Sequence, residues 1–147
     1  MRYVLLLELA DARRLAAAAQ AEADRRSAAV TVAVVDAGGQ LLLLERRDGA
    51  SPASAEVAVA KARMAALNGK ATGDLEATIN GPRPALLQLS GLLGQPAAAM
   101  AGGLPLLHEG YCIGAIGISG MTPEVDVAIA VAGLSALLAS GPTTPSP

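Results

Sequence analysis

A lysine interrupts an otherwise apolar stripe in the segment SAEVAVAKARMAALN. Val57, Lys61, Met64 and Asn68 are spaced at i, i+4, i+7 and i+11, which brings them to one face of an α-helix, whereas Arg63 falls on the far side. An ammonium group in such a stripe either extends past small neighbours to water or is a partly desolvated cation aimed at an anionic ligand. In the second case Lys61 could also carry a proton in acid–base catalysis. The sequence leaves both interpretations open.

Two arginines and an aspartate precede the helix that carries Lys61. Arg46, Arg47 and Asp48 follow an apolar run, and Gly49 allows the chain to turn toward the lysine. Guanidinium groups on such a turn could clamp a carboxylate together with Lys61, and Asp48 could assist. The alternative is a loop stabilised by ion pairs.

The glycine-rich segment GAIGISG has glycine at every third position, although glycine destabilises the interior of a strand. Gly102 and Gly103 alone would be a flexible joint, but with Gly114, Gly117 and Gly120 they form a hairpin whose backbone N–H groups could approach a flat or anionic ligand. Strand alternation places Gly114 and Gly117 on opposite faces, so one faces a pocket and the other a helix or a neighbouring subunit. The same alternation assigns strand neighbours: Cys112 and Ile116 beside Gly114, Ile113 and Ala115 beside Gly117.

The single histidine, His108, lies next to Glu109 at a predicted hairpin turn. It is either an exposed turn residue or a ligand of a metal or haem, and Met64 is a second, weaker candidate for haem. No two candidate ligands have the spacing of a dedicated metal site, so none is expected. Ser119 is not a hydrolase nucleophile, because Met121 stands where a nucleophile elbow needs glycine.

The composition excludes several classes of protein. Of the 147 residues 52% are hydrophobic, yet there is no Phe and no Trp, so Ala, Val, Leu and Ile must build the core. More apolar surface than one small core can bury predicts self-association. A net charge of −2 offers nothing to attract nucleic acid. We expect no membrane span and no signal peptide, and one cysteine fits the reducing cytoplasm.

Hydrophobic periodicity predicts hairpins that alternate with helices. This order is typical of an α+β layered fold, an antiparallel sheet of two hairpins with helices packed on it. We expect one domain over residues 1–139 and a disordered tail over 140–147. The expected elements are a helix within 8–26, a hairpin turning at 37–40, a helix over 53–68, a loop with a short helical turn over 68–84, weakly patterned chain to 100, a hairpin turning at 109–110 and a helix capped by Thr122.

Four segments in a fixed order resemble the GlcG/HbpS family, also called the haem-degrading domain and similar to the C-terminal domain of PduO. They are VAVVDAGGQLLLLERRDGA, VAVAKARMAA, GGLPLLHEGYCIGAIGISG and TPEVDVAIAVAG. The resemblance implies a profilin-like sandwich, symmetric oligomers from dimers to octamers, and binding of haem or iron in some members. Carried over by position, it implies a pocket made of Asp48, Gly49, Lys61, Gly102, Gly103, Pro105 and Ser119.

Two positions depart from the family pattern, because Arg47 replaces a methionine and Met121 replaces a glycine. Three functions remain in competition. The first is a binder of haem or another small anionic ligand, whose carboxylates would meet Lys61 or Arg47. The second is a cofactor-free lyase or isomerase acting on a small carboxylate, anchored by Arg46 or Arg47, with Lys61 moving a proton and Asp48 assisting. The third is a non-catalytic oligomeric scaffold.

Overall fold

Two hairpins combine into one four-stranded antiparallel sheet in the computed structural model, which describes residues 1–141. The strand order is β2-β1-β4-β3, so the hairpins join through the pairing of β1 with β4. The turns lie where the sequence predicts them, and the expected α+β class is confirmed. The strands are β1 (Thr31–Asp36), β2 (Leu41–Arg46), β3 (Gly103–His108) and β4 (Tyr111–Ser119).

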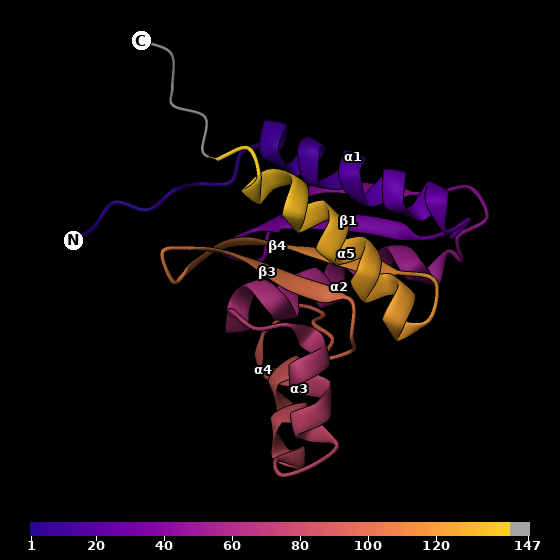
Figure 1. The fold of residues 1–147 in the computed structure, drawn as a ribbon. Helices are drawn as coiled ribbons and strands as arrows, with labels where there is room; N and C mark the ends of the chain where they lie inside the picture. Colours follow the sequence, from indigo (N-terminus) through magenta and orange to yellow (C-terminus); the bar gives the residue numbers. More distant parts are fainter. Residues whose placement is uncertain (142–147) are drawn as a thin grey trace.

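Helices cover both faces of this sheet (Figure 1). Helices α1 (Leu9–Arg25) and α5 (Pro123–Leu138) lie on one face and enclose the larger core cluster with residues of β1 and β4. Helix α2 (Ala53–Asn68) lies on the other face, where its alanines pack closely on Ala33, Val35 and Ala115. Small side chains on both surfaces let this helix approach the sheet backbone.

Helix α5 begins as the sequence predicts. The Thr122 side chain accepts a hydrogen bond from the backbone N–H of Val125, and Pro123 takes the first helical position. Asp126 in the same first turn complements the helix dipole. As shown below, this carboxylate has a second role.

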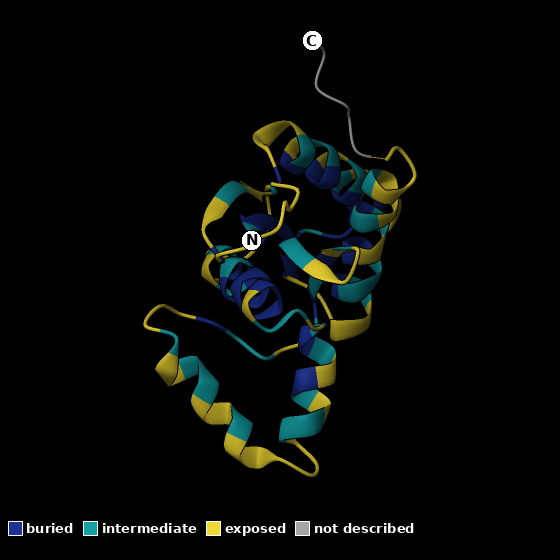
Figure 2. Ribbon diagram, turned by 90° about the vertical axis from the view of Figure 1, so that its left-hand side faces the viewer, coloured by how far each residue is buried: buried dark blue, intermediate teal, exposed yellow. Residues whose placement is uncertain are grey.

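After α2 a helical arm stands where the sequence predicts a loop with a short helical turn over 68–84 and weakly patterned chain to 100 (Figure 2). It comprises α3 (Thr72–Ile79), the 3-10 helix η1 (Pro84–Gln88) and α4 (Leu89–Leu92), and it projects from the body with most of its surface exposed. An eight-residue helix is marginal by itself. Contacts with the rest of the chain hold α3 in place, since Leu75 packs on Met64. One such contact is too little to give the segment a clear hydrophobic periodicity, and the sequence therefore did not predict the arm.

A β-bulge in β4 reverses two of the predicted side-chain directions. Leu106 pairs with Gly114 and Leu107 with Cys112, so Ile113 is an extra residue in β4. Ile113 consequently packs toward α1 and α5, and Cys112 toward α2. The alternation expected from a flat strand was wrong for these two residues and correct for Ile116 and Ala115.

The ends of the chain and its hydropathy complete the description. Of the tail expected to be disordered, residues 142–147 lie outside the described residues. Within residues 1–141, none of the helices combines the length and the apolar character that crossing a membrane requires.

Candidate functional site

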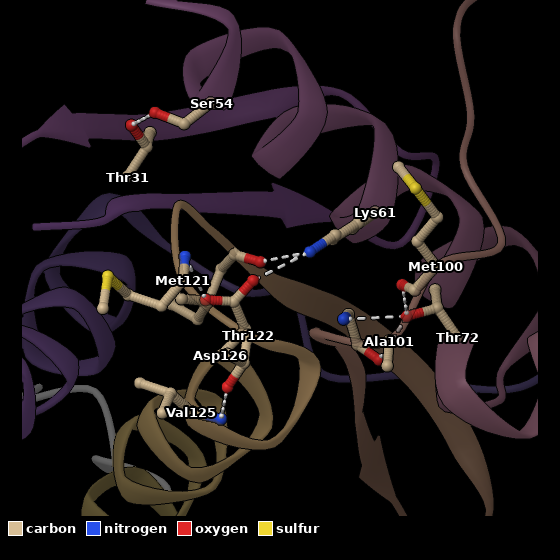
Figure 3. Close-up of polar contacts among 12 residues, drawn as sticks. Thr31, Ser54, Lys61, Thr72, Met100, Ala101, Met121, Thr122, Val125 and Asp126 are labelled. Carbon is tan, nitrogen blue, oxygen red and sulfur yellow. Dashed lines mark hydrogen bonds and ion pairs between the residues drawn. The ribbon is translucent and has the colours of Figure 1, made fainter. Parts of the chain in front are cut away.

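The lysine end is our name for the end of the sheet where β4 stops at Ser119 and Lys61 lies beneath it. Lys61 is 5% exposed, and its Nζ lies 3.1 Å from Asp126 Oδ2 (Figure 3). The same Nζ donates a hydrogen bond of 2.9 Å to the carbonyl of Ile118. Asp126 Oδ1 in turn accepts from the backbone N–H of Met121. The buried ion pair therefore ties α2, β4 and α5 together.

The pairing with Asp126 matches neither interpretation of the lysine stripe. Lys61 does not extend to water, and its positive charge already has an anionic partner within the chain. To bind a substrate carboxylate or transfer a proton, it would first have to leave Asp126, at a large desolvation cost. Sequence reasoning did not identify Asp126 as the partner of Lys61. Its position as an acid among the apolar residues of VDVAIAV was the available signal.

The glycines of the lysine end are explained by close packing of the chain on itself. A Cβ on Gly117 would meet the backbone of α2, including the nitrogen of Ala62 at 2.7 Å. A Cβ on Gly103 would meet Thr72 at 2.8 Å, and one on Gly102 would lie 2.9 Å from Lys61 Nζ. The space at these three glycines, expected for a flat or anionic ligand, is thus filled by the protein itself.

Gly114 serves a different segment from Gly117. A Cβ on Gly114 would lie 2.7 Å from the Leu7 side chain, which packs in the core beneath α1 and α5. The prediction that Gly114 and Gly117 lie on opposite faces is confirmed, and the helix expected at one of them is α2 beside Gly117. The pocket expected at the other is not present, because the Leu7 side chain fills the space beside Gly114. Gly120 has a φ of +140° and approaches the carbonyl of Ala29, which requires glycine where the chain turns toward α5.

The arginine clamp expected around Lys61 does not form in the structure. Arg47 donates from Nη1 to the backbone carbonyl and the side-chain oxygen of Gln20, and it pairs with Asp24. Both partners belong to α1, on the face of the sheet opposite to α2 and Lys61 (Figure 1). Arg47, which stands where the family pattern has a methionine, thus attaches the end of β2 to α1 through Gln20 and Asp24. The ion-paired loop, the alternative considered above, describes this turn.

The remaining residues of the implied pocket lie around the same end without converging on Lys61. Arg46 and Asp48 are exposed, and Gly49 adopts a φ of +86° in the turn between them and α2. Ser119 is 8% exposed and lies opposite Thr31 on β1. Pro105 lies in the edge strand β3, opposite Ala115.

A buried pair of hydroxyl groups lies next to Ser119. The hydroxyl oxygens of Thr31 and Ser54 are 2.7 Å apart and share a hydrogen bond (Figure 3).

Two further side chains of α2 are occupied by packing. Met64 is 1% exposed and lies against Leu75 and Ala97, so its sulfur is not available to haem without repacking of the arm. Arg63, placed on the far side by the sequence, is also buried. Its guanidinium donates to the carbonyls of Gly39 and Pro96 and so secures the first hairpin turn.

The histidine end is our name for the opposite end of the sheet, at the turn from β3 to β4. His108 is the last residue of β3 and pairs with Tyr111 across the turn. An apolar groove of about 370 Å³ lies beside it, between the N-terminal segment, the hairpin and the last turn of α5. The groove is lined by Leu5, Leu6, Leu7, Glu8, Asp11, Leu106, Leu107, His108, Ile113, Leu137, Leu138 and Gly141.

A second groove of about 200 Å³ continues around His108 toward Tyr111. It shares three lining residues with the first groove: Leu5, His108 and Ile113. Because of the bulge in β4, the Ile113 side chain points to the face of the sheet where these two grooves lie. Sequence reasoning missed the groove, because residues 1–8 form neither helix nor strand and carry no motif.

The thiol of Cys112 takes no part in these grooves. It points toward α2 and donates a hydrogen bond to the carbonyl of Gly114. Burial raises the pKa of this thiol above its ordinary value, and the hydrogen bond to Gly114 opposes the shift only in part. The thiol is therefore protonated at neutral pH and is a poor metal ligand.

The chemistry available at the histidine end is that of one imidazole beside apolar walls. Within residues 1–141, His, Cys, Asp and Glu side chains form no cluster of three that could hold a metal ion. A single nitrogen donor next to leucine and isoleucine walls suits a flat apolar molecule that brings its own metal.

Comparisons with known proteins point to one family. The family model described as haem degrading protein HbpS-like matches residues 7–135. Protein GlcG of Escherichia coli (strain K12) is 35% identical over 119 residues, which cover 81% of this chain and 85% of GlcG. The crystal structure of Klebsiella pneumoniae protein ORFY has a TM-score of 0.85 at 32% identity and covers 95% of both chains. The crystal structure of a PduOC:haem complex has a TM-score of 0.81 at 32% identity, covering 90% of this chain and 95% of that one.

Proposed function

Because this chain belongs to the HbpS-like family of haem-degrading proteins, we propose that it binds haem in the groove beside His108. A relative with the same fold, PduOC, is known as a haem complex and supports the choice of ligand. The observation that carries the proposed location is that the only histidine of the chain lines both grooves of the histidine end, the first of which is mostly apolar.

The side chains of the histidine end fit a porphyrin. Leucine and isoleucine side chains from the N-terminal segment and the hairpin can pack on an apolar macrocycle. A bound haem supplies an iron that accepts an axial ligand, and the imidazole of His108 is the group that would provide it. The second candidate ligand of the sequence, Met64, is buried under the arm.

The charges at the groove set the orientation of the haem carboxylates. Glu8 and Asp11 line one side, where they cap the first turn of α1. Their negative charge disfavours the carboxylates on that side. Arg2 hydrogen-bonds to Tyr111 of the second groove but lines neither groove itself. We therefore propose that the carboxylates point away from Glu8 and Asp11 into solvent, and not toward Lys61.

Titration of the purified protein with haemin tests this function. We expect a saturable shift of the Soret band, and we expect His108→Ala to weaken binding at least about tenfold, the equivalent of 1.4 kcal/mol. Met100→Ala is the matched control, since this exposed methionine lies at the lysine end. A Soret shift that depends on Arg47 and not on His108 would relocate the ligand to the lysine end and refute the proposed site.

Self-association is also part of the proposal. The arm exposes apolar side chains that a monomer would leave in water, including Leu87 at 65% and Leu92 at 76% exposure. We expect an assembly between a dimer and an octamer in light scattering at micromolar concentration. A monodisperse monomer under these conditions would contradict it. A cytoplasmic location also stays a prediction.

A further inference from the structure

The N-terminal strap, our name for residues 2–7, forms one wall of the grooves at the histidine end. It is neither helix nor strand and is held firmly at only one of its ends, by Leu7. Leu7 is 8% exposed and fills the notch left by the missing side chain of Gly114. Leu5 and Leu6 are 38% and 78% exposed, so the middle of the strap buries little apolar surface.

The other end of the strap is attached by one exposed contact. Arg2 Nη1 donates a hydrogen bond of 2.8 Å to the hydroxyl of Tyr111, and its guanidinium carbon lies 4.1 Å from the centre of the Tyr111 ring. A cation–π contact at an exposed site contributes about 0.5–1 kcal/mol. Thermal motion opens a contact of this strength often, whereas the buried Leu7 holds its position.

Leu5 is the residue of the strap that contributes to both grooves. Leu5 lines both the first groove of about 370 Å³ and the second of about 200 Å³. His108 and Ile113 are the other two residues that the grooves share. Movement of the strap away from the hairpin would join the two grooves beside His108, because His108 and Ile113 line both.

We propose that the strap is a movable cover, hinged at Leu7 and fastened by Arg2 to Tyr111, and that Leu5 must move aside before haem reaches His108. This inference rests on the proposed function, because it concerns access to the same site. It makes ligand association depend on the fraction of molecules with an open strap. Removing the Arg2 side chain, which lines neither groove, then raises the rate of haem association without altering a groove residue.

Stopped-flow mixing with haemin tests the cover. We expect Arg2→Ala to raise the association rate about fivefold, the factor that corresponds to loss of a contact of about 1 kcal/mol. Tyr111→Phe keeps the ring and removes only the hydroxyl, so a smaller increase is expected. Arg13→Ala is the matched control, because Arg13 is an exposed arginine in α1, away from the hairpin.

Limited trypsin digestion gives a readout that does not depend on the spectrum of bound haem. Cleavage after Arg2 in the ligand-free protein should be faster in Tyr111→Phe than in the unaltered chain, and haemin should accelerate it. Equal association rates for Arg2→Ala, Arg13→Ala and the unaltered protein, with binding still dependent on His108, would overturn the cover and leave the haem site intact. A failure of haemin to bind at all would overturn both.

Discussion

The two ends of the sheet differ in what fills them. At the lysine end the charges and glycines are satisfied by the chain itself, because Asp126 pairs with Lys61 and the backbone of α2 occupies the space beside Gly117. At the histidine end leucine side chains surround grooves that no other segment fills. The lysine end, which carries most of the recognisable sequence motifs, is therefore the more closely packed of the two. The histidine end carries almost no motif and has room for a ligand.

The cause of this difference is the size of the side chains. Glycine and alanine at the lysine end allow the backbones of α2 and β4 to approach closely. At the histidine end, leucines of the hairpin, of α5 and of the strap line a groove of about 370 Å³. A glycine pattern that looks like a ligand cradle can thus mark helix-on-sheet contact.

Breaking the ion pair at the lysine end has the largest expected effect. Lys61→Met leaves the carboxylate of Asp126 buried without its cation, and we expect the free energy of unfolding to fall by about 3–5 kcal/mol. Urea denaturation of this variant, of Asp126→Leu and of the double variant measures the coupling. The double variant should lose less than the sum of the single losses. Additive losses would show that the pair contributes no net coupling.

Adding a methyl group at Gly117 is expected to have the next largest effect. The new Cβ would collide with the backbone of α2, so Gly117→Ala should lower the free energy of unfolding by about 1–3 kcal/mol. Gly91→Ala in α4 is the control, because nothing lies within 4 Å of its Cβ position and alanine favours a helix. If both variants melt at the same temperature, close packing does not explain the glycines.

The free energy of unfolding should depend weakly on pH in the alkaline range because of the Cys112 thiol, which lies near the start of β4. Because burial raises the pKa of Cys112 in the folded state, the folded protein retains its thiol proton longer than the unfolded chain. Stability is then unaffected below the ordinary thiol value of 9.0 and falls as pH rises above it. The difference in unfolding free energy between the unaltered protein and Cys112→Ala, followed from pH 8 to about pH 10.5, measures this slope. A flat difference would mean that the thiol titrates as in the unfolded chain.

Local patterns in the sequence determined the framework of the fold. The glycine pair between two apolar runs specified the first hairpin, and Thr122 followed by Pro123 specified the start of α5. The predicted range 53–68 agrees with the bounds of α2. The opposite faces of Gly114 and Gly117 also followed from alternation alone. Each of these features depends on residues that are neighbours along the chain, so their types are sufficient to predict it.

The partners of the charged and apolar side chains were decided only by the tertiary structure. The sequence singled out Lys61 but not Asp126, Arg47 but not its partners on α1, and His108 but not the strap. The bulge at Ile113, one residue inserted between paired strands, reversed two side chains that a regular strand would have placed correctly. Such choices depend on which distant segments meet and on how closely their backbones approach, and spacing along a single chain carries no record of either.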